Sequence, residues 1–557
     1  MDNLRLILLF ALAAVLLLIY QAWMADYGGA REPPAVAEAP EHAASSTPEG
    51  IPQVPAAAPH QPTSTPTLAP TTTGEADQAS TISVDTDVLR LEISPRGGTI
   101  ESIWLKNYPV SPDRPNDKVR LMKPAPPNMF IAQSGLLSGE PGRLPTHEAL
   151  FTTTATSYSL GPDRDSLEVD LVWTDSSGVQ VHKRYRFMRG SYVIAMTQEV
   201  TNGSGAPLVV REYSQLQRTE LHDPNEAKFV HTYTGGVYYG PQDKYQKVSF
   251  KDMQKQRLDK QVTDGWIAMI QHYFMAAWIP PRGAAATFYT SVLDGSRYII
   301  GLYSAPLTVP SGSSHSFNDR IFAGPKLQDT LASVAPGLDL TVDYGWLTVI
   351  AQPIYWLLQK IHSLVGNWGW AIIILTILIK AAFYKLSETS YKSMANMRRL
   401  TPRMQALKDR YGDDKQRLNQ AMMDLYKKEK INPLGGCLPI VVQIPVFISL
   451  YWVLLDSVEL RQAPFALWIN NLSAPDPYFV LPLIMGVSMF IQQKLNPAPP
   501  DPIQAKVMMS LPFVFTVFFA FFPAGLVLYW VVNNVLSIAQ QWNITRTIEQ
   551  AAAKARH

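Results

Sequence analysis

The chain has 557 residues, with 48 lysines and arginines against 46 aspartates and glutamates, and its formal net charge is +2. This length leaves room for several domains, and the single cysteine, Cys437, excludes an intramolecular disulfide and a CxxC metal site. The apolar segments are confined to the N-terminus and the last two-fifths of the chain. The composition therefore indicates a polytopic membrane protein with one large extramembrane domain.

The N-terminal segment Leu6–Tyr20 is unbroken apolar sequence. A cleaved signal peptide is one interpretation, but almost no positive charge precedes the segment and no A-x-A cleavage site follows it. Tyr20, Trp23 and Tyr27 are suited to a membrane interface. We therefore expect residues 1–24 to form an uncleaved transmembrane anchor.

A linker and a β domain follow the anchor. Residues 25–80 are rich in Pro, Ala and Thr, a composition that cannot bury a core and favours an extended tether. From 81 to 326 the sequence alternates as strands do, for example in LEVDLVW (167–173), with turn signals such as NGSG (202–205) between the strands. This pattern predicts an antiparallel β-sandwich. Its histidines occur singly and its sequence has no GxSxG or phosphate-binding glycine loop, so we expect no enzymatic activity in this domain.

Residues 336–366 contain an apolar face at helical spacing, which consists of Leu347, Ile350, Ile354, Leu357, Leu358 and Ile361. This pattern predicts an amphipathic helix that lies in the membrane interface, anchored by Trp346 and Trp356. The alternative is a membrane span, which would invert the orientation of everything that follows it.

Charge decides between these two interpretations. Between Lys385 and Lys430 there are twelve basic and six acidic residues, and the positive-inside rule places such a segment in the cytoplasm. With the N-terminus also inside, only the anchor and Trp368–Tyr384 span the membrane before this segment, and the β domain is periplasmic. Residues 387–432 predict a helical hairpin whose Met- and Leu-rich stripes pack mainly on each other. The basic face could meet anionic lipid or ribosomal RNA, without specific base recognition.

The remaining apolar segments predict a total of six transmembrane helices with both chain ends inside. The loop 457–477 holds Arg461 as its one basic residue, which suits the periplasmic side. After the anchor, the expected spans are 367–386, 434–456, 478–495, 506–522 and 525–545, with the periplasmic loop 457–477, the cytoplasmic loop 496–505 and the cytoplasmic tail 546–557.

Lys380 is a charge well inside the apolar run of the second span. A charge at the centre of a membrane helix costs about 2.5–3.5 kcal/mol on insertion scales, so such a residue marks a functional site by default. The alternative is that the side chain extends to the cytoplasmic interface, because Lys385 lies only about 7.5 Å further along the helix. Thr376 precedes Lys380 by one turn and shares its helical face.

The last span carries a polar stripe at helical spacing, which consists of Trp530, Asn534, Ser537 and Gln541. Stripes of this kind often only hold helices together. However, no Asp or Glu lies deep in any of the later spans, so this chain offers Lys380 no ion pair there. We therefore expect Thr376, Gln443, Asn534 and water to surround Lys380, in a cavity open toward the cytoplasm.

Four strings in this order carry a resemblance to a known family: GNWGWAIIILTILIKAAFY, YGDDKQRLNQAMMDLYKKEKINPLGGCLPIVVQIPVF, SVELRQAPFALWI and FFPAGLVLYWVVNN. They resemble the YidC family of membrane protein insertases of Gram-negative bacteria. The resemblance runs from the anchor to the sixth span and is densest over about 340–545. It implies a polytopic α-helical membrane protein with a five-helix insertase core and, at 81–326, a periplasmic antiparallel β-supersandwich.

The resemblance also implies an amphiphilic groove that is open to the cytoplasm and to lipid and holds one positive residue, here Lys380. Close relatives have arginine at this position, and lysine keeps the charge without the planar five-donor fork. Tryptophan stands at 530 where close relatives have a second tyrosine. The expected groove residues are Lys380, Thr376, Gln443, Tyr529, Trp530 and Asn534, and the expected apolar path for the substrate is Phe447, Phe515 and Phe518.

The hypothesis that follows is an ATP-independent insertase and folding chaperone of the inner membrane, not an enzyme, with no cofactor and no metal. The expected partners are nascent inner-membrane proteins, the Sec translocon (SecYEG, SecDF), the ribosome through the hairpin and loops, and membrane lipids. Because the C-terminal tail is short, we do not expect strong ribosome tethering through it. One alternative is a secondary transporter that uses Lys380 as a relay, although the two halves show no repeat. The other alternative is a scaffold or chaperone for membrane complexes.

Overall fold

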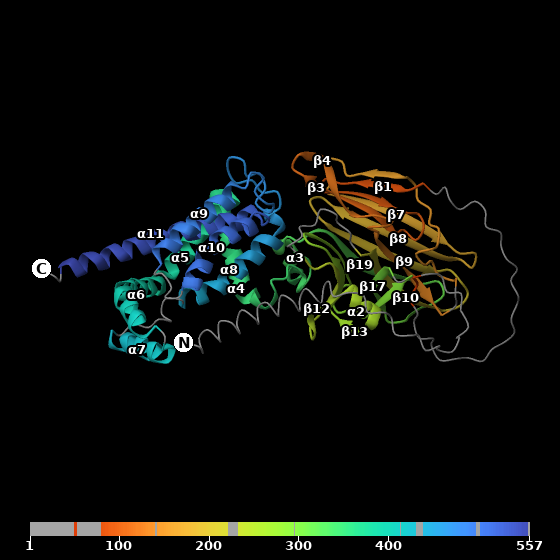
Figure 1. Ribbon diagram of the computed structural model, residues 1–557. Helices are drawn as coiled ribbons and strands as arrows, with labels where there is room; N and C mark the ends of the chain where they lie inside the picture. Colours follow the sequence, from red (N-terminus) through yellow and green to blue (C-terminus); the bar gives the residue numbers. More distant parts are fainter. Residues whose placement is uncertain are drawn as a thin grey trace.

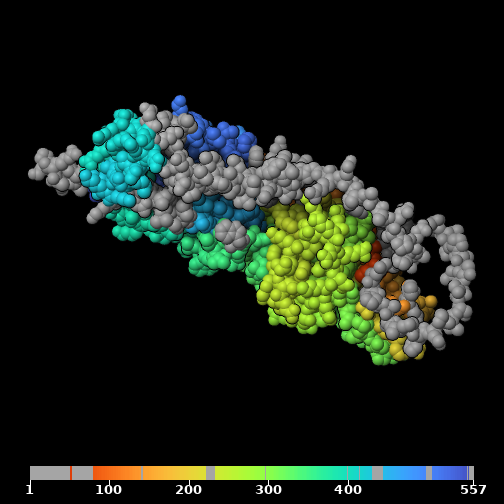
Figure 2. Space-filling model, turned by 60° about the horizontal axis from the view of Figure 1, so that its bottom comes forward, coloured from red at the N-terminus to blue at the C-terminus, as the bar shows by residue number. Residues whose placement is uncertain are grey.

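The computed structural model describes residues 50–52, 80–139, 142–220, 232–294, 296–412, 414–429, 438–496 and 502–554. The expected anchor at 1–24 and most of the linker at 25–80 lie outside these residues. The described chain forms a β domain and a helical region that lie side by side along the long dimension of the molecule (Figure 1). In the space-filling view, the hairpin that follows Tyr384 lies at the end remote from the β domain (Figure 2).

The β domain consists of two sheets. The larger sheet has eleven strands in the order β13-β16-β17-β10-β5-β3-β2-β1-β6, with β18 paired to β10 and β4 paired to β3. Its strands are β1 (Ile82–Asp85), β2 (Leu89–Ile93), β3 (Ile100–Ser111), β4 (Arg114–Met122), β5 (Phe130–Ser138), β6 (Ser157–Ser159), β10 (Leu208–Thr219), β13 (Asp259–Thr263), β16 (Ala285–Leu293), β17 (Arg297–Ser304) and β18 (Leu307–Val309). All pairings in this sheet are antiparallel except that of β1 with β6.

The smaller sheet has eight strands in the order β12-β11-β14-β15-β19-β9-β8-β7. They are β7 (Ser166–Thr174), β8 (Val179–Met188), β9 (Val193–Asn202), β11 (Gly235–Gly240), β12 (Lys244–Val248), β14 (Trp266–Ile270), β15 (Phe274–Ile279) and β19 (Ser314–Pro325), and a short helix α2 (Phe250–Lys255) follows β12. Alternate residues of β8 and β9 are buried, as the period of two requires. Their apolar side chains belong to the same hydrophobic core as those of the larger sheet. The predicted β-sandwich is confirmed.

A polar cluster lies inside this apolar core. The ammonium of Lys183, on β8, is fully buried and donates to the carbonyls of Gly97 (2.7 Å) and Ser134 (2.9 Å). The carboxyl group of Glu212 accepts a hydrogen bond from Gln198 at 2.9 Å. Buried polar groups are tolerated when they are hydrogen-bonded, and these bonds connect the two sheets.

Burial gives one carboxyl group of this cluster an unusual pKa. Asp319 of β19 accepts a hydrogen bond from Ser214 of β10 at 2.8 Å, and desolvation raises the pKa of Asp319 from 3.8 to about 6. A folded-state pKa above the unfolded value means that the folded domain binds the proton more tightly. The stability that Asp319 contributes is therefore complete below pH 3.8 and is lost as the pH rises through about 6.

Replacing Asp319 by Asn should remove this loss. We expect the melting temperature of Asp319→Asn to rise relative to that of the wild type as the pH increases from 4 to 7. The gain should be several degrees, because 1 kcal/mol shifts the melting temperature by about 2–4 °C in a domain of this size. Thermal unfolding of the full chain in detergent, followed by far-UV circular dichroism, measures the difference. Asp163→Asn, at an exposed position, is the control, and a pH-independent difference for Asp319→Asn would contradict the assignment.

The helical region begins after β19. Its helices are α3 (Gln328–Val334), α4 (Thr348–Val365), α5 (Trp368–Ala382), α6 (Tyr384–Tyr411), α7 (Lys415–Lys428), α8 (Leu438–Asp456), α9 (Val480–Leu495), α10 (Pro502–Phe519) and α11 (Ala524–Lys554), with short 3-10 turns at Leu338–Thr341, Gly345–Leu347 and Val458–Leu460. Taken singly, the helices within the described residues fall short of a membrane span in length and apolar character. The helices Trp368–Ala382 and Tyr384–Met397 are long and apolar enough for a span only when they are taken together, and they are bent by 67° relative to each other.

The bend falls at Phe383, whose backbone (φ −93°, ψ 12°) leaves the α-helical region for one residue. The helix α6 then turns aside and pairs with α7. Residues of their facing stripes form a separate apolar cluster, which consists of Leu400, Met404 and Met422 with Leu407, Leu418, Leu425 and Tyr426 around them. The hairpin thus closes on itself through the stripes that the sequence shows.

The helix α4 has two different apolar faces. Ala351, Ile354 and Leu358 are buried against α5 and α8, whereas Val349 and Leu364 are 83% and 86% exposed. An apolar side chain exposed in this way is suited to a membrane interface. The buried face contains Ile354, Leu358 and Ile361 of the apolar face that the helical spacing predicts.

The helix α10 packs chiefly on α9. The side chain of Thr516 lies so close to Gly486 that a Cβ atom at this position would clash with its hydroxyl oxygen. Small residues allow membrane helices to pack at such short range.

The β domain is joined to the helical region by specific contacts after α8. Arg461 and Gln462 donate side-chain hydrogen bonds to the carbonyl of Pro109 on β3, at 2.8 and 3.0 Å. On the same side, burial lowers the pKa of His272 to about 3, so the neutral ring donates to the carbonyl of Leu455 at 3.0 Å. These bonds fix the position of the β domain relative to the end of α8.

Candidate functional site

A cavity of about 340 Å³ lies among α5, α6, α8, α9 and α11. It is lined by Lys380, Ser387, Ser390, Tyr391, Met394, Gln443, Ile444, Phe447, Met489, Gln492, Gln493, Asn496, Tyr529, Trp530, Asn533, Asn534 and Ser537. One side of this set is polar and the other is aromatic or aliphatic. The cavity can therefore accept a polar group beside an apolar one.

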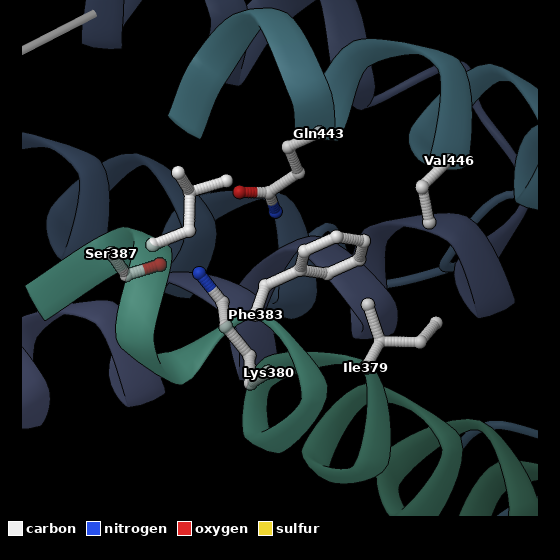
Figure 3. A pocket seen from close by; sticks show the side chains of 7 residues that line it. Ile379, Lys380, Phe383, Ser387, Gln443 and Val446 are labelled. Carbon is white, nitrogen blue, oxygen red and sulfur yellow. The ribbon is translucent and has the colours of Figure 1, made fainter. Parts of the chain in front are cut away.

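Lys380 is located in the last turn of α5, just before the bend. The ammonium donates a hydrogen bond to the hydroxyl of Ser537 on α11 at 2.7 Å. In the close-up the ammonium points into the space between Ser387 and Gln443, while Ile379 and Val446 face each other on the apolar side (Figure 3). The charge is half-buried and faces the cavity.

The helix α11 supplies the hydrogen bonds that hold this arrangement. Ser537 donates to the carbonyl of Asn533 at 2.7 Å, and the amide of Gln443 on α8 donates to the side chain of Asn533 at 2.5 Å. Asn534 donates instead to Ser488 of α9, at 3.0 Å. Polar side chains of α11, Asn533 beside the stripe and Asn534 and Ser537 within it, thus contact α8, α9 and α5 at once.

Two of the groups expected around Lys380 are engaged elsewhere. The hydroxyl of Thr376 donates to the carbonyl of Ile372 in its own helix at 2.7 Å, and Thr376 does not line the cavity. Asn534 lines the cavity, but its amide is directed to Ser488. Gln443 lies beside Lys380, and the hydrogen-bond partner of the ammonium is Ser537.

The apolar side of the cavity is aromatic. The ring of Phe447 on α8 meets Trp530 edge to face, with 4.4 Å between the ring centroids, and lies 6.0 Å from Tyr529. Phe515 and Phe518 of α10 do not line the cavity. They reach it through a chain of rings, since both contact Phe519, whose centroid lies 5.0 Å from that of Trp530.

The electrostatics of the site follow from what surrounds the ammonium. Among the described residues, no carboxylate lies within ion-pair distance of Lys380. A cation with neutral hydrogen-bond partners attracts an anionic or strongly polar group that enters the cavity. In the described part of the chain, no group of three or more His, Cys, Asp or Glu is placed to hold a metal ion.

Several lining residues were not among the predicted groove residues. Ser387, Ser390, Tyr391 and Met394 lie in the segment that the sequence assigns to the hairpin, and the bend at Phe383 brings them to the cavity. Ser537 was visible as part of the polar stripe, but its contact with Lys380 depends on how α11 packs against α5. No pattern in the sequence indicates the bend, because neither proline nor glycine stands there.

The hydrogen bond from Lys380 to Ser537 can be tested through the reactivity of the amine. We expect Ser537→Ala to increase modification of Lys380 by a small amine-reactive reagent severalfold, because the ammonium loses its acceptor and becomes more mobile. Mass spectrometry of the modified peptide measures the rate. The matched control is Ser488→Ala, which removes a hydroxyl bonded to α11 without touching Lys380. Equal reactivity in the wild type and Ser537→Ala would refute the contact.

Comparison with known proteins gives consistent matches over the whole chain. The family model described as YidC periplasmic domain matches residues 81–357, and the one described as 60Kd inner membrane protein matches residues 360–551. A curated relative named membrane protein insertase YidC, from Methylococcus capsulatus, is 54% identical over 557 residues and covers 100% of both chains. One of the same name from Nitrosococcus oceani is 51% identical and covers 99% of this chain and 100% of its own. A solved structure titled as an active YidC insertase is 17% identical, with a TM-score of 0.37, over 83% of this chain and 92% of that one.

Proposed function

This chain belongs to the YidC family of membrane protein insertases, and from this premise we propose that the cavity beside Lys380 receives the polar flank of a nascent transmembrane segment. As a member of the family it is an insertase of the inner membrane, and nascent membrane proteins are its substrates. Its β-sandwich is the periplasmic domain. The resemblance seen in the sequence is thereby confirmed.

The observation that carries the proposal is the isolated ammonium of Lys380 inside a helical bundle. It is held by a neutral hydroxyl group and faces a cavity with polar amides on α8, α9 and α11. A polar or acidic flank gains a charge-assisted hydrogen bond there that the lipid interior cannot offer. The flank is thus held part of the way across the membrane.

The apolar part of the same segment takes the neighbouring path. Phe447 and Trp530 form the apolar wall of the cavity, and Phe515 and Phe518 continue it along α10 toward an exposed surface. Transfer of about twenty apolar residues into lipid then drives release, because apolar burial is worth about 25 cal/mol per Å². No covalent bond is made or broken, so insertion needs no catalytic residue and no ATP. The named relatives give no support to a secondary transporter.

The proposed topology has six spans, at 1–24, 367–386, 434–456, 478–495, 506–522 and 525–545. The basic hairpin supports a cytoplasmic position for α6 and α7, and with them for the mouth of the cavity that α6 lines. The β domain, joined to the other end of α8, is then periplasmic, in agreement with its family. In this frame the five helices α5 and α8–α11, with the bend at Phe383, form the insertase core.

Further partners follow from the surfaces. The hairpin carries twelve basic against six acidic residues between Lys385 and Lys430, which suits a ribosome at the cytoplasmic mouth. The exposed apolar residues of α10, Phe513, Val514 and Val517, suit lipid or a translocon such as SecYEG with SecDF. The chain then works alone or beside the Sec translocon.

The charge of Lys380 should set the preference for the substrate flank. We expect Lys380→Glu to lower insertion of a single-span substrate with an acidic flank at least about tenfold, because a like charge replaces an attraction and 1.4 kcal/mol already corresponds to tenfold. Lys380→Ala should be intermediate, and Lys380→Arg should remain active. Protease protection of the substrate in proteoliposomes that contain only this protein measures insertion.

The matched control is Lys385→Glu, because Lys385 is exposed, pairs with Glu388 and does not line the cavity. A substrate with a basic flank should reverse the order of the Glu and wild-type proteins. If Lys380→Glu inserts the acidic-flank substrate as fast as the wild type, the electrostatic step is wrong.

A further inference from the structure

A short piece of the linker is bound to the β domain. Gly50, Ile51 and Pro52 lie against the face of the larger sheet that is turned away from the smaller sheet. On β10, Leu216 and its alternate neighbours belong to the core between the sheets, whereas Tyr213 and Gln215 point to the opposite face.

The site for this tripeptide is built around a buried amide. Gln215 is fully buried, and its Nε2 atom donates to the carbonyl of Gly50 at 3.1 Å and to the side-chain oxygen of Gln133 at 2.8 Å. The hydroxyl of Tyr289 donates to the Gln215 oxygen at 2.5 Å. Gln133 and Tyr289 thus fix the orientation of the amide, so that one N–H is presented to a peptide carbonyl.

An apolar pocket lies next to this amide. Ile51 packs against a small cluster of Leu137, Tyr213 and Tyr303, which is separate from the main core of the domain. Pro52 is buried as well. His147 completes the floor, with its main-chain N–H and its ring both bonded to the hydroxyl of Tyr213, at 3.0 and 2.7 Å.

These contacts define the class of ligand. The site offers a donor for a backbone carbonyl, then a pocket for a branched apolar side chain, then a covered position for proline. Without a peptide, the N–H of Gln215 would lose this carbonyl acceptor. The glycine allows the positive φ of 86° at Gly50, and the ring of Pro52 fixes one backbone angle, so the segment has less conformational entropy to lose on binding.

We propose that this pocket is a peptide-binding site of the periplasmic domain, specific for a glycine–apolar–proline segment whose glycine has a positive φ, and that Gly50–Ile51–Pro52 of the same chain is its resident ligand. A ligand on the same chain has an effective concentration in the millimolar range, so it excludes a free peptide of equal affinity. The proposal does not depend on the role of Lys380.

The test uses a fluorescein-labelled peptide of residues 49–54, EGIPQV, and the full chain in detergent. Ile51→Asp disables the resident ligand and leaves the pocket intact. We expect this variant to bind the peptide at least about tenfold more tightly than the wild type, by fluorescence anisotropy. The double variant Ile51→Asp with Gln215→Leu should lose this binding, and a scrambled peptide should bind neither protein.

Two outcomes would overturn the proposal: the wild type and Ile51→Asp bind the peptide equally, or neither binds it. Tyr289→Phe in the Ile51→Asp background is the milder change if Gln215→Leu unfolds, because it removes only the hydroxyl that orients the amide. As an independent measurement, a photo-reactive residue at position 51 of the otherwise native chain should cross-link to peptides that contain Tyr213 or Tyr303. Cross-links confined to other parts of the chain, or none, would also refute the site.

Discussion

The constraint on which the helical region depends is that an ammonium group within an apolar bundle needs hydrogen-bond acceptors or water. Lys380 meets it with the hydroxyl of Ser537 and a position at the edge of a cavity. The other features of the bundle are arranged around this requirement. Polar side chains of α11 contact α5, α8 and α9, and the bend after Lys380 brings residues of α6 to the wall of the cavity. A fully apolar bundle would pack more simply, but it would offer nothing to a polar flank.

The sequence predicts the sandwich and the groove to different degrees. Alternation along the strands is a local property, and it was sufficient for the β domain. For the groove, the spacing places Thr376 and Lys380 on one face, yet a helical threonine can bond to the carbonyl one turn earlier, and Thr376 does so. The partner of Lys380 depends on the register between α5 and α11, which no single helix encodes. Likewise α11 continues to Lys554, beyond the expected end at 545, because good helix formers follow.

The β domain is attached to the rest of the protein at more than one place. Arg461 and Gln462 donate hydrogen bonds to Pro109 near the end of β3, and the neutral ring of His272 donates to the carbonyl of Leu455 nearby. These are directional hydrogen bonds between groups that are at least partly buried, so they fix an orientation rather than only a distance. The domain therefore has a defined orientation relative to the bundle, although the linker before it has the composition of a flexible tether.

The packing of α10 has a consequence for how a substrate leaves the bundle. Its main support is α9, with close approach at Gly486, and toward α11 it has the ring contact of Phe519 with Trp530. Phe513, Val514 and Val517 are turned outward. In the proposed topology these side chains touch lipid, so the thickness of the surrounding bilayer acts directly on α10. If substrates leave along α10 as proposed, the position of this helix depends partly on the lipid, so the same chain should release its substrates at different rates in membranes of different composition.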